Sequence, residues 1–251
     1  MTVLITKLSW LAVAAITLSL QVSFRAAGAR LTTGLIYRRG QGSDVNQVIS
    51  EFARGEAESR EALAHYSYQQ DLLVQSLDNG RVTGQFHRVS QISPGTDRKP
   101  HEKIVSFPAS TLNSVIITKE DLTDLSALAE FTFGEANISK YKFQYKGLES
   151  DGGEDRYVFS AKPASGGRAH EGLFKGQIWI DVKTMRVVKL RGKWEHSGDD
   201  QGFPVLTMTR GVVDGYDFPL YTYADQTIDF PNAPPVHVRV QVRYRDFVKA
   251  N

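Results

Sequence analysis

The sequence predicts a mainly β, α+β protein whose strands form one large antiparallel sheet, curled into an open or closed barrel. Apolar and polar residues alternate with a period of two over most of the chain after residue 64, as they do in half-buried strands. Turn residues recur at hairpin spacing between these runs, and only two segments have helical periodicity. We expect about ten strands against two helices, with no linker long enough to divide the chain.

The N-terminus is typical of a secretory signal peptide. Lys7 precedes the uncharged apolar run Leu8 to Leu20, and Ala27-Gly28-Ala29 places small residues where a signal peptidase reads them. The alternative is an uncut membrane anchor, but the run is shorter than the ~20 residues that cross a bilayer. We therefore predict cleavage after Ala29 and export to the periplasm, with no stable membrane anchor after cleavage.

Cleavage divides the chain into a signal peptide (1–29), a flexible N-terminal segment (30–42) and a single β domain (43–251). Lys7 and Arg25 are the only charged residues before Arg30, so the mature chain carries as many basic as acidic residues. A neutral chain gives no electrostatic reason to expect a nucleic-acid partner. The chain has no cysteine, so its core has to stabilise it without disulfides, and it cannot be acylated as a bacterial lipoprotein is.

Two helices are expected. The first begins near the N-cap residues Ser43 and Asp44 and ends near Leu63, with apolar residues at helical spacing. The second runs from Lys119 to Phe131 behind the N-cap Thr118. Its stripe of Leu122, Leu125 and Leu128 has to pack on something, so we predict that it is a mobile cover for the sheet, with a fixed structural helix as the alternative.

The strands follow from the same alternation. Asp78-Asn79-Gly80 predicts a tight hairpin, because Asn-Gly supplies positive φ angles, and Pro108 ends the next strand. The remaining strands are expected in SKYKFQYKGLES, RYVFSAKP, FKGQIWID, MRVVKLRG, VLTMTRGVV, LYTYADQTIDF and VHVRVQVRYRDF. In the last of these, valines alternate with arginines, so one face is buried and the other is solvated. The pattern leaves open whether the buried faces meet in a filled core or enclose an apolar cavity.

Three stretches resemble the outer-membrane lipoprotein-sorting and lipoprotein-carrier (LolA/LolB-like) family. They are FKGQIWIDVKTMRVVKLRGKW, the preceding YKFQYKGLESDGGEDRYVFSAKP and the closing PPVHVRVQVRYRDF, within a likeness that covers roughly Val45 to Lys249. The resemblance implies an open half-barrel with helices closing its mouth over a hydrophobic cavity, which holds lipoprotein acyl chains in the periplasm. Since this chain lacks cysteine, it is similar only to the soluble carriers. No family binding residue is carried over.

The apolar faces of the strands supply the predicted binding residues for a lipid or the acyl chain of a lipoprotein. These are Tyr141, Phe143, Tyr145, Tyr157, Phe159, Phe174, Ile178, Ile180, Val238, Val240, Val242 and Tyr244.

Nothing in the sequence indicates catalysis. The six histidines lack metal-ligand spacing, and no Gly-x-Ser-x-Gly elbow, nucleophilic cysteine, phosphate loop or calcium loop is present. We expect no catalytic residue, no metal and no cofactor. The leading hypothesis is a periplasmic carrier or binding protein. The alternatives are a protein–protein module of an envelope complex with a packed interior, and an enzyme that uses the cavity.

Overall fold

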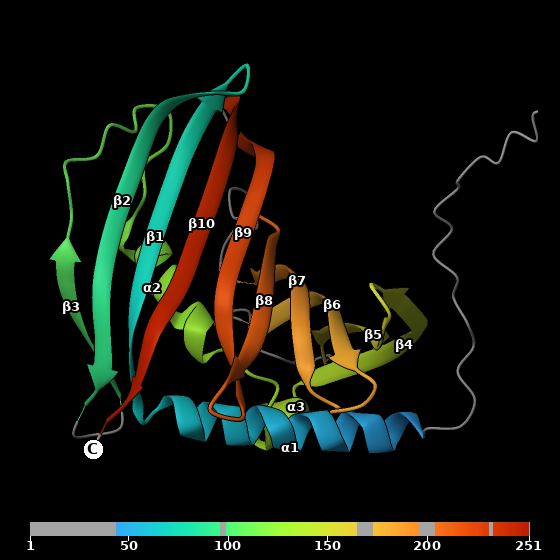
Figure 1. The fold of residues 1–251 in the computed structure, drawn as a ribbon. Helices are drawn as coiled ribbons and strands as arrows, with labels where there is room; N and C mark the ends of the chain where they lie inside the picture. The colour runs from blue at the N-terminus through green and yellow to red at the C-terminus, as the bar shows by residue number, and fades with distance from the viewer. Residues whose placement is uncertain (1–43, 96–98, 165–172, 196–203, 231–232, 251) are drawn as a thin grey trace, which may run out of the picture. The chain divides into compact units, whose positions relative to one another are not determined.

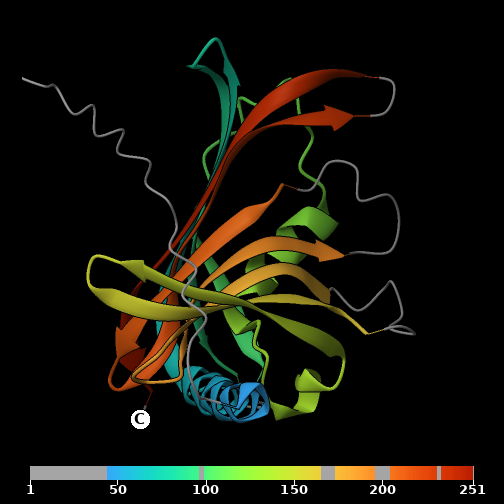
Figure 2. The same cartoon turned by 90° about the vertical axis from the view of Figure 1, so that its right-hand side faces the viewer.

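One antiparallel sheet in the order β3-β2-β1-β10-β9-β8-β7-β6-β5-β4 organises the described part of the chain (Figure 1). Its two edge strands, β3 and β4, do not pair with each other, so the curled sheet does not close into a barrel. Figure 2 shows the strands curving around the green helical segment that joins these two edge strands. The predicted fold class is confirmed.

The computed structural model describes residues 44–95, 99–164, 173–195, 204–230 and 233–250. The predicted signal peptide, its cleavage site at Ala29 and the segment 30–42 lie outside the described residues and stay predictions. In the described ranges, no helix combines the length and the apolar character needed to cross a membrane. The elements are α1 Val45–Leu63, β1 Tyr66–Asp78, β2 Arg81–Pro94, β3 Pro100–Ser106, α2 Lys119–Ala127, η1 Leu128–Glu130, α3 Glu135–Ile138, β4 Tyr141–Asp151, β5 Glu154–Pro163, β6 Leu173–Asp181, β7 Val187–Glu195, β8 Leu206–Val213, β9 Tyr216–Phe230 and β10 Ala233–Lys249.

Helix α1 lies across one end of the sheet (Figure 1). The Asp44 side chain caps it by accepting a hydrogen bond from the Asn46 amide at 2.9 Å, as its sequence predicts. Val48, Phe52 and Leu63 are buried along one face. The helix therefore closes this end of the curled sheet with apolar side chains.

The hairpins form where the turn residues predict them. Asn79 and Gly80 have φ angles of 49° and 78°, which join β1 to β2, and Asp214 and Gly215 join β8 to β9 in the same way. Strand β10 then pairs with β1, with Val240 opposite Val74. The last strand of the chain therefore lies between β1 and β9, and it joins the first hairpin to the other C-terminal strands of the sheet.

Two glycines, one in FKGQIWID and one in KLRG, lie opposite each other in the β6–β7 hairpin. Gly176 lies opposite Gly192, and the Phe174 ring covers both from the inner side of the sheet. A Cβ atom on Gly176 would lie 2.6 Å from the Gly192 Cα and 2.7 Å from Phe174 Cζ, so these positions exclude any side chain. Phe174 is fully buried as a result.

Candidate functional site

The inner face of the sheet brings all twelve predicted binding residues into one hydrophobic cluster. Nine are buried, and the other three, Phe143, Tyr145 and Tyr157, are partly buried against the same cluster. The nine come from β4, β5, β6 and β10, and they are Tyr141, Phe159, Phe174, Ile178, Ile180, Val238, Val240, Val242 and Tyr244. The structure shows these residues packed against protein, and their binding role stays a prediction.

Aromatic rings fill the centre of this face. Phe133 lies in edge-to-face contact with Tyr141 at 4.9 Å, with Phe143 at 5.5 Å and with Phe174 at 5.6 Å between ring centroids. Phe52 of α1 contacts Phe143 at 5.4 Å. Since Phe133 comes from the segment between η1 and α3, that segment occupies the space that a cavity would take.

We call residues 119–133 the plug, since this segment covers the concave face. Leu125 and Leu128 are buried and Leu122 packs partly against the core, so the predicted stripe does face the sheet. The predicted helix is too long at its C-terminus: α2 ends at Ala127, and Leu128 belongs to the 3₁₀ turn η1. Phe131 is already extended, which carries the chain away from the helix axis and toward Phe133.

The two ends of the plug are held differently. At α2, Gln70 Nε2 donates to the Leu125 carbonyl at 3.5 Å, and Arg88 Nη2 donates to Ser126 Oγ at 3.1 Å. At the other end, Arg210 Nη2 donates to the Phe131 carbonyl at 2.7 Å, and Glu56 accepts from the Phe133 amide at 3.0 Å. The preceding residues 107–117 form no helix or strand, and most are exposed. The plug is therefore anchored firmly at residues 131–133 and more weakly along α2.

A buried ion pair builds that anchor. Glu56 of α1 and Arg210 of β8 are in direct contact, and each side chain is only 3% exposed. Burial raises the pKa of Glu56, while the Arg210 charge and the Phe133 amide lower it in part. Because both charges are out of water, either one alone would be costly to bury. The pair fixes α1, β8 and the end of the plug to one another.

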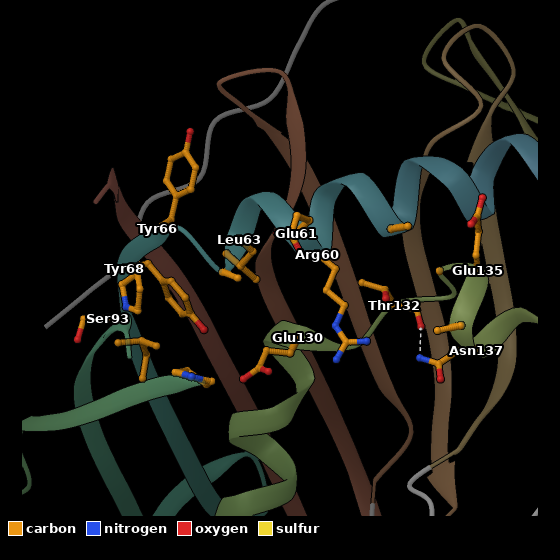
Figure 3. Close-up of a pocket in the computed structure, with 17 residues that line it drawn as sticks. Arg60, Glu61, Leu63, Tyr66, Tyr68, Ser93, Glu130, Thr132, Glu135 and Asn137 are labelled. Atoms are coloured by element: carbon orange, nitrogen blue, oxygen red, sulfur yellow. Dashed lines mark hydrogen bonds between the residues drawn. The ribbon is translucent and has the colours of Figure 1, made fainter. Parts of the chain in front are cut away.

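A cavity of about 490 Å³ opens beside the anchored end of the plug (Figure 3). Its walls are the last turns of α1, the start of β1, the end of β2 and the segment from Glu130 to Asn137. Apolar lining comes from Leu63 and Ile92, and polar lining from Arg60, Tyr68, Glu130 and Thr132. None of the twelve predicted binding residues lines this cavity.

Sequence reasoning missed these four polar residues. Arg60 lies in a helix, Tyr68 in a strand and Glu130 in the 3₁₀ turn, so no spacing along the chain indicates that they meet. One signal could have indicated Glu130: it is a charged residue that follows the apolar stripe of Leu125 and Leu128, two positions after Leu128.

The outer face offers one polar cluster with a perturbed carboxyl group. Asp225 accepts hydrogen bonds from His237, from the Tyr223 hydroxyl at 2.8 Å and from Arg239 Nε at 3.0 Å. These donors lower the pKa of Asp225 to about 2. The carboxylate is thus saturated by donors at the surface. Among the described residues, no group of three or more histidines, aspartates and glutamates is placed to hold a metal ion.

No family model matches the sequence, and no curated protein matches it. Among solved structures, a DUF1329 family protein from Desulfovibrio piger is similar with 13% identity and a TM-score of 0.38, over 78% of this chain and 93% of that one. A LolA superfamily protein from Nitrosomonas europaea is similar with 14% identity and a TM-score of 0.36, over 78% and 92%.

A domain described as an outer membrane lipoprotein-sorting protein, from Vibrio parahaemolyticus, is similar with 16% identity and a TM-score of 0.34, over 77% and 90%. The similar structures thus include members of the group that the sequence resembles. Similarity at these identities and TM-scores does not indicate a ligand, so a binding function is argued from the residues of this chain.

Proposed function

We propose that this protein is a periplasmic, non-enzymatic carrier or binding protein for a lipid or the acyl chain of a lipoprotein. The observation that carries the proposal is the plug: Leu125, Leu128 and Phe133 cover an apolar concave face, and the α2 part of the plug makes polar contacts with the sheet through Gln70 and Arg88, without the buried ion pair that anchors residues 131–133. When α2 moves away, the apolar face that it covers becomes available to an acyl chain of similar chemistry.

The energetics suit reversible loading. Burying an acyl chain stabilises the complex by about 0.8 kcal/mol per methylene, so eight methylenes supply about 6 kcal/mol. Association costs about 4–15 kcal/mol, and displacing Leu125 and Leu128 adds to that cost. The net affinity is therefore modest, as a carrier that must release its load requires.

We expect Phe143→Glu to abolish binding of a fluorescent fatty acid, because it places an unpaired charge on the inner face beside Phe133 and Phe52. Gln144→Glu adds the same charge one residue later on the exposed face of β4 and should leave binding unchanged. Binding is measured by fluorescence titration, and circular dichroism confirms that each variant is folded. Failure of the folded wild-type protein to bind the probe at micromolar concentration would refute the carrier function.

A protein–protein module is the second candidate, and the β3 edge favours it. Five large apolar residues of β2, β3 and the segment after β3 are more than 45% exposed, and β3 itself is exposed along its whole length. They are Val82, Ile104, Val105, Phe107 and Ile116. Exposed apolar patches and open strand edges are features of docking surfaces. This candidate predicts that Ile104→Lys and Phe107→Lys abolish co-purification of an envelope protein and leave fatty-acid binding intact.

A further inference from the structure

The cavity beside the plug contains two opposite charges that no other described residue pairs. Arg60 extends from α1 to beside Glu130, whose carboxyl group points toward the side of the cavity on which Tyr68 lies (Figure 3). Within the described residues, neither side chain forms a hydrogen bond or an ion pair. Burial raises the pKa of Glu130, and the charge of Arg60 lowers it in part, so the two side chains interact electrostatically. Besides Glu61 and Glu135, the cavity thus offers a guest the Arg60 cation and the half-buried Glu130 carboxyl group.

Two hydroxyl groups line the same space without a hydrogen-bond partner among the described residues, and that of Thr132 is itself buried. Tyr68 is 4% exposed, and its hydroxyl forms no hydrogen bond in the part of the chain that the structure describes. Thr132 is 6% exposed, and its buried Oγ1 has no hydrogen-bond partner in the ranges that the structure describes. Buried polar groups usually have a hydrogen-bond partner, and a guest in the cavity would supply one for Thr132.

The apolar wall of the cavity is continuous with the core. Leu63, Tyr68 and Ile92 line the cavity and also belong to the buried hydrophobic cluster behind the plug. A guest with a polar head in the cavity would therefore direct an attached chain toward the concave face. The volume of about 490 Å³ is within the range of small-molecule sites, which is about 300–1,000 Å³.

The charges select the head group. A purely anionic head would meet Arg60 but would be repelled by Glu130 and by the cavity-lining Glu61 and Glu135. A purely cationic head would meet Glu130 but would leave Arg60 without a partner. A head that carries both charges satisfies Arg60 and Glu130 at once, and its oxygen atoms can accept hydrogen bonds from Tyr68 and Thr132.

We propose that this cavity binds the zwitterionic head of an amphiphile, with an anionic group at Arg60 and an ammonium group at Glu130. The inference deepens the proposed function and rests on it for the placement of the acyl chain. The head site itself is defined by the cavity and by the side chains of Arg60, Tyr68, Glu130 and Thr132.

Calorimetric titration of the full-length mature protein tests the proposal with three probes. These are dihexanoyl-phosphatidylethanolamine, dihexanoyl-phosphatidylglycerol, which has the same chains and an anionic head, and free phosphoethanolamine, which has the zwitterionic head and no chains. We expect the phosphatidylethanolamine to bind about tenfold more tightly than each of the other two, since charge-assisted contacts and chain burial both contribute.

Two variants assign the charges. Arg60→Gln should weaken binding of both phospholipids about tenfold, whereas Glu130→Gln should weaken only that of the phosphatidylethanolamine and abolish its advantage. The matched controls are Arg54→Gln and Glu51→Gln, which make the same charge changes on exposed or partly exposed positions of α1 outside the cavity. Both controls should bind all three probes as the wild type does.

The outcomes separate the two claims. Equal binding of both phospholipids, unaffected by Arg60→Gln and Glu130→Gln, overturns the head site and leaves the carrier function standing. Binding of free phosphoethanolamine as tight as that of the phosphatidylethanolamine supports the head site and contradicts acyl-chain carriage. Binding of none of the three probes overturns both.

Discussion

Arg210→Met is expected to lower the free energy of unfolding by about 3–5 kcal/mol, because it leaves the Glu56 carboxylate buried without its counter-charge. The same substitution removes the donor to the Phe131 carbonyl, so the anchored end of the plug loosens as well. Urea denaturation at pH 7.5 measures the loss. Arg243→Met, which removes a guanidinium from the outer face near Tyr221, should change stability by less than about 0.5 kcal/mol.

The loss should depend on pH in a defined direction. Burial already raises the pKa of Glu56, and without Arg210 the main opposing charge is gone. A carboxyl group with a raised folded-state pKa favours the folded state once it is protonated. The deficit of Arg210→Met should therefore shrink as the pH falls through the folded-state pKa toward the ordinary value of 4.5.

A double variant separates the charge from the packing. Glu56→Gln/Arg210→Met removes both charges and should be more stable than Arg210→Met alone at pH 7.5. A deficit of less than about 1 kcal/mol for Arg210→Met, or one that grows as the pH falls, would contradict this account of the anchor.

Gly176→Ala is expected to cost about 3 kcal/mol of unfolding free energy, because no space exists for its methyl group. The added Cβ would approach the Gly192 Cα and the Phe174 ring to less than 3 Å and would also press on the Arg191 carbonyl. Phe174 contacts Phe131, Phe133 and Trp194, so its displacement disturbs the packing of the plug.

The partner strand provides the check on this interpretation. Gly192→Ala should be similarly destabilising, whereas Gln177→Ala, at the next position and on the outer face, should be nearly neutral. Replacing Phe174 by leucine in the Gly176→Ala background should recover part of the loss, since the two positions are in contact. Thermal melts of the four variants suffice, and a neutral Gly176→Ala would show that the hairpin adjusts freely.

The strands were predictable because their signals are local. Asn79-Gly80 specifies its own turn, and the alternation of valine with arginine in β10 assigns both faces of the strand before its partners are known. The N-cap of α1 was predictable for the same reason. The end of α2 was not, because neither glycine nor proline follows Ala127, and the extended Phe131 is held by Arg210 from a strand 79 residues away.

The cavity was beyond prediction for a related reason. Its polar residues come from α1, β1, η1 and the segment after η1, and they meet only after the sheet has curled and the plug has crossed it. The sequence left a filled core and an open cavity as equal alternatives. The structure gives both, with a packed face behind Leu125 and Phe133 and an open space beside Glu130.

Hydrogen exchange of the plug tests the carrier function most directly. The exchange of amides in α2 and η1 is compared with and without dihexanoyl-phosphatidylethanolamine, with α1 as the internal reference. We expect α2 to exchange faster than α1 in the free protein, because its contacts with the sheet are weaker. Lipid should reduce the protection of α2 further by displacing Leu125 and Leu128, while α1 stays unchanged. Protection of α2 that equals that of α1 and does not change at saturating lipid would contradict the plug as a movable cover.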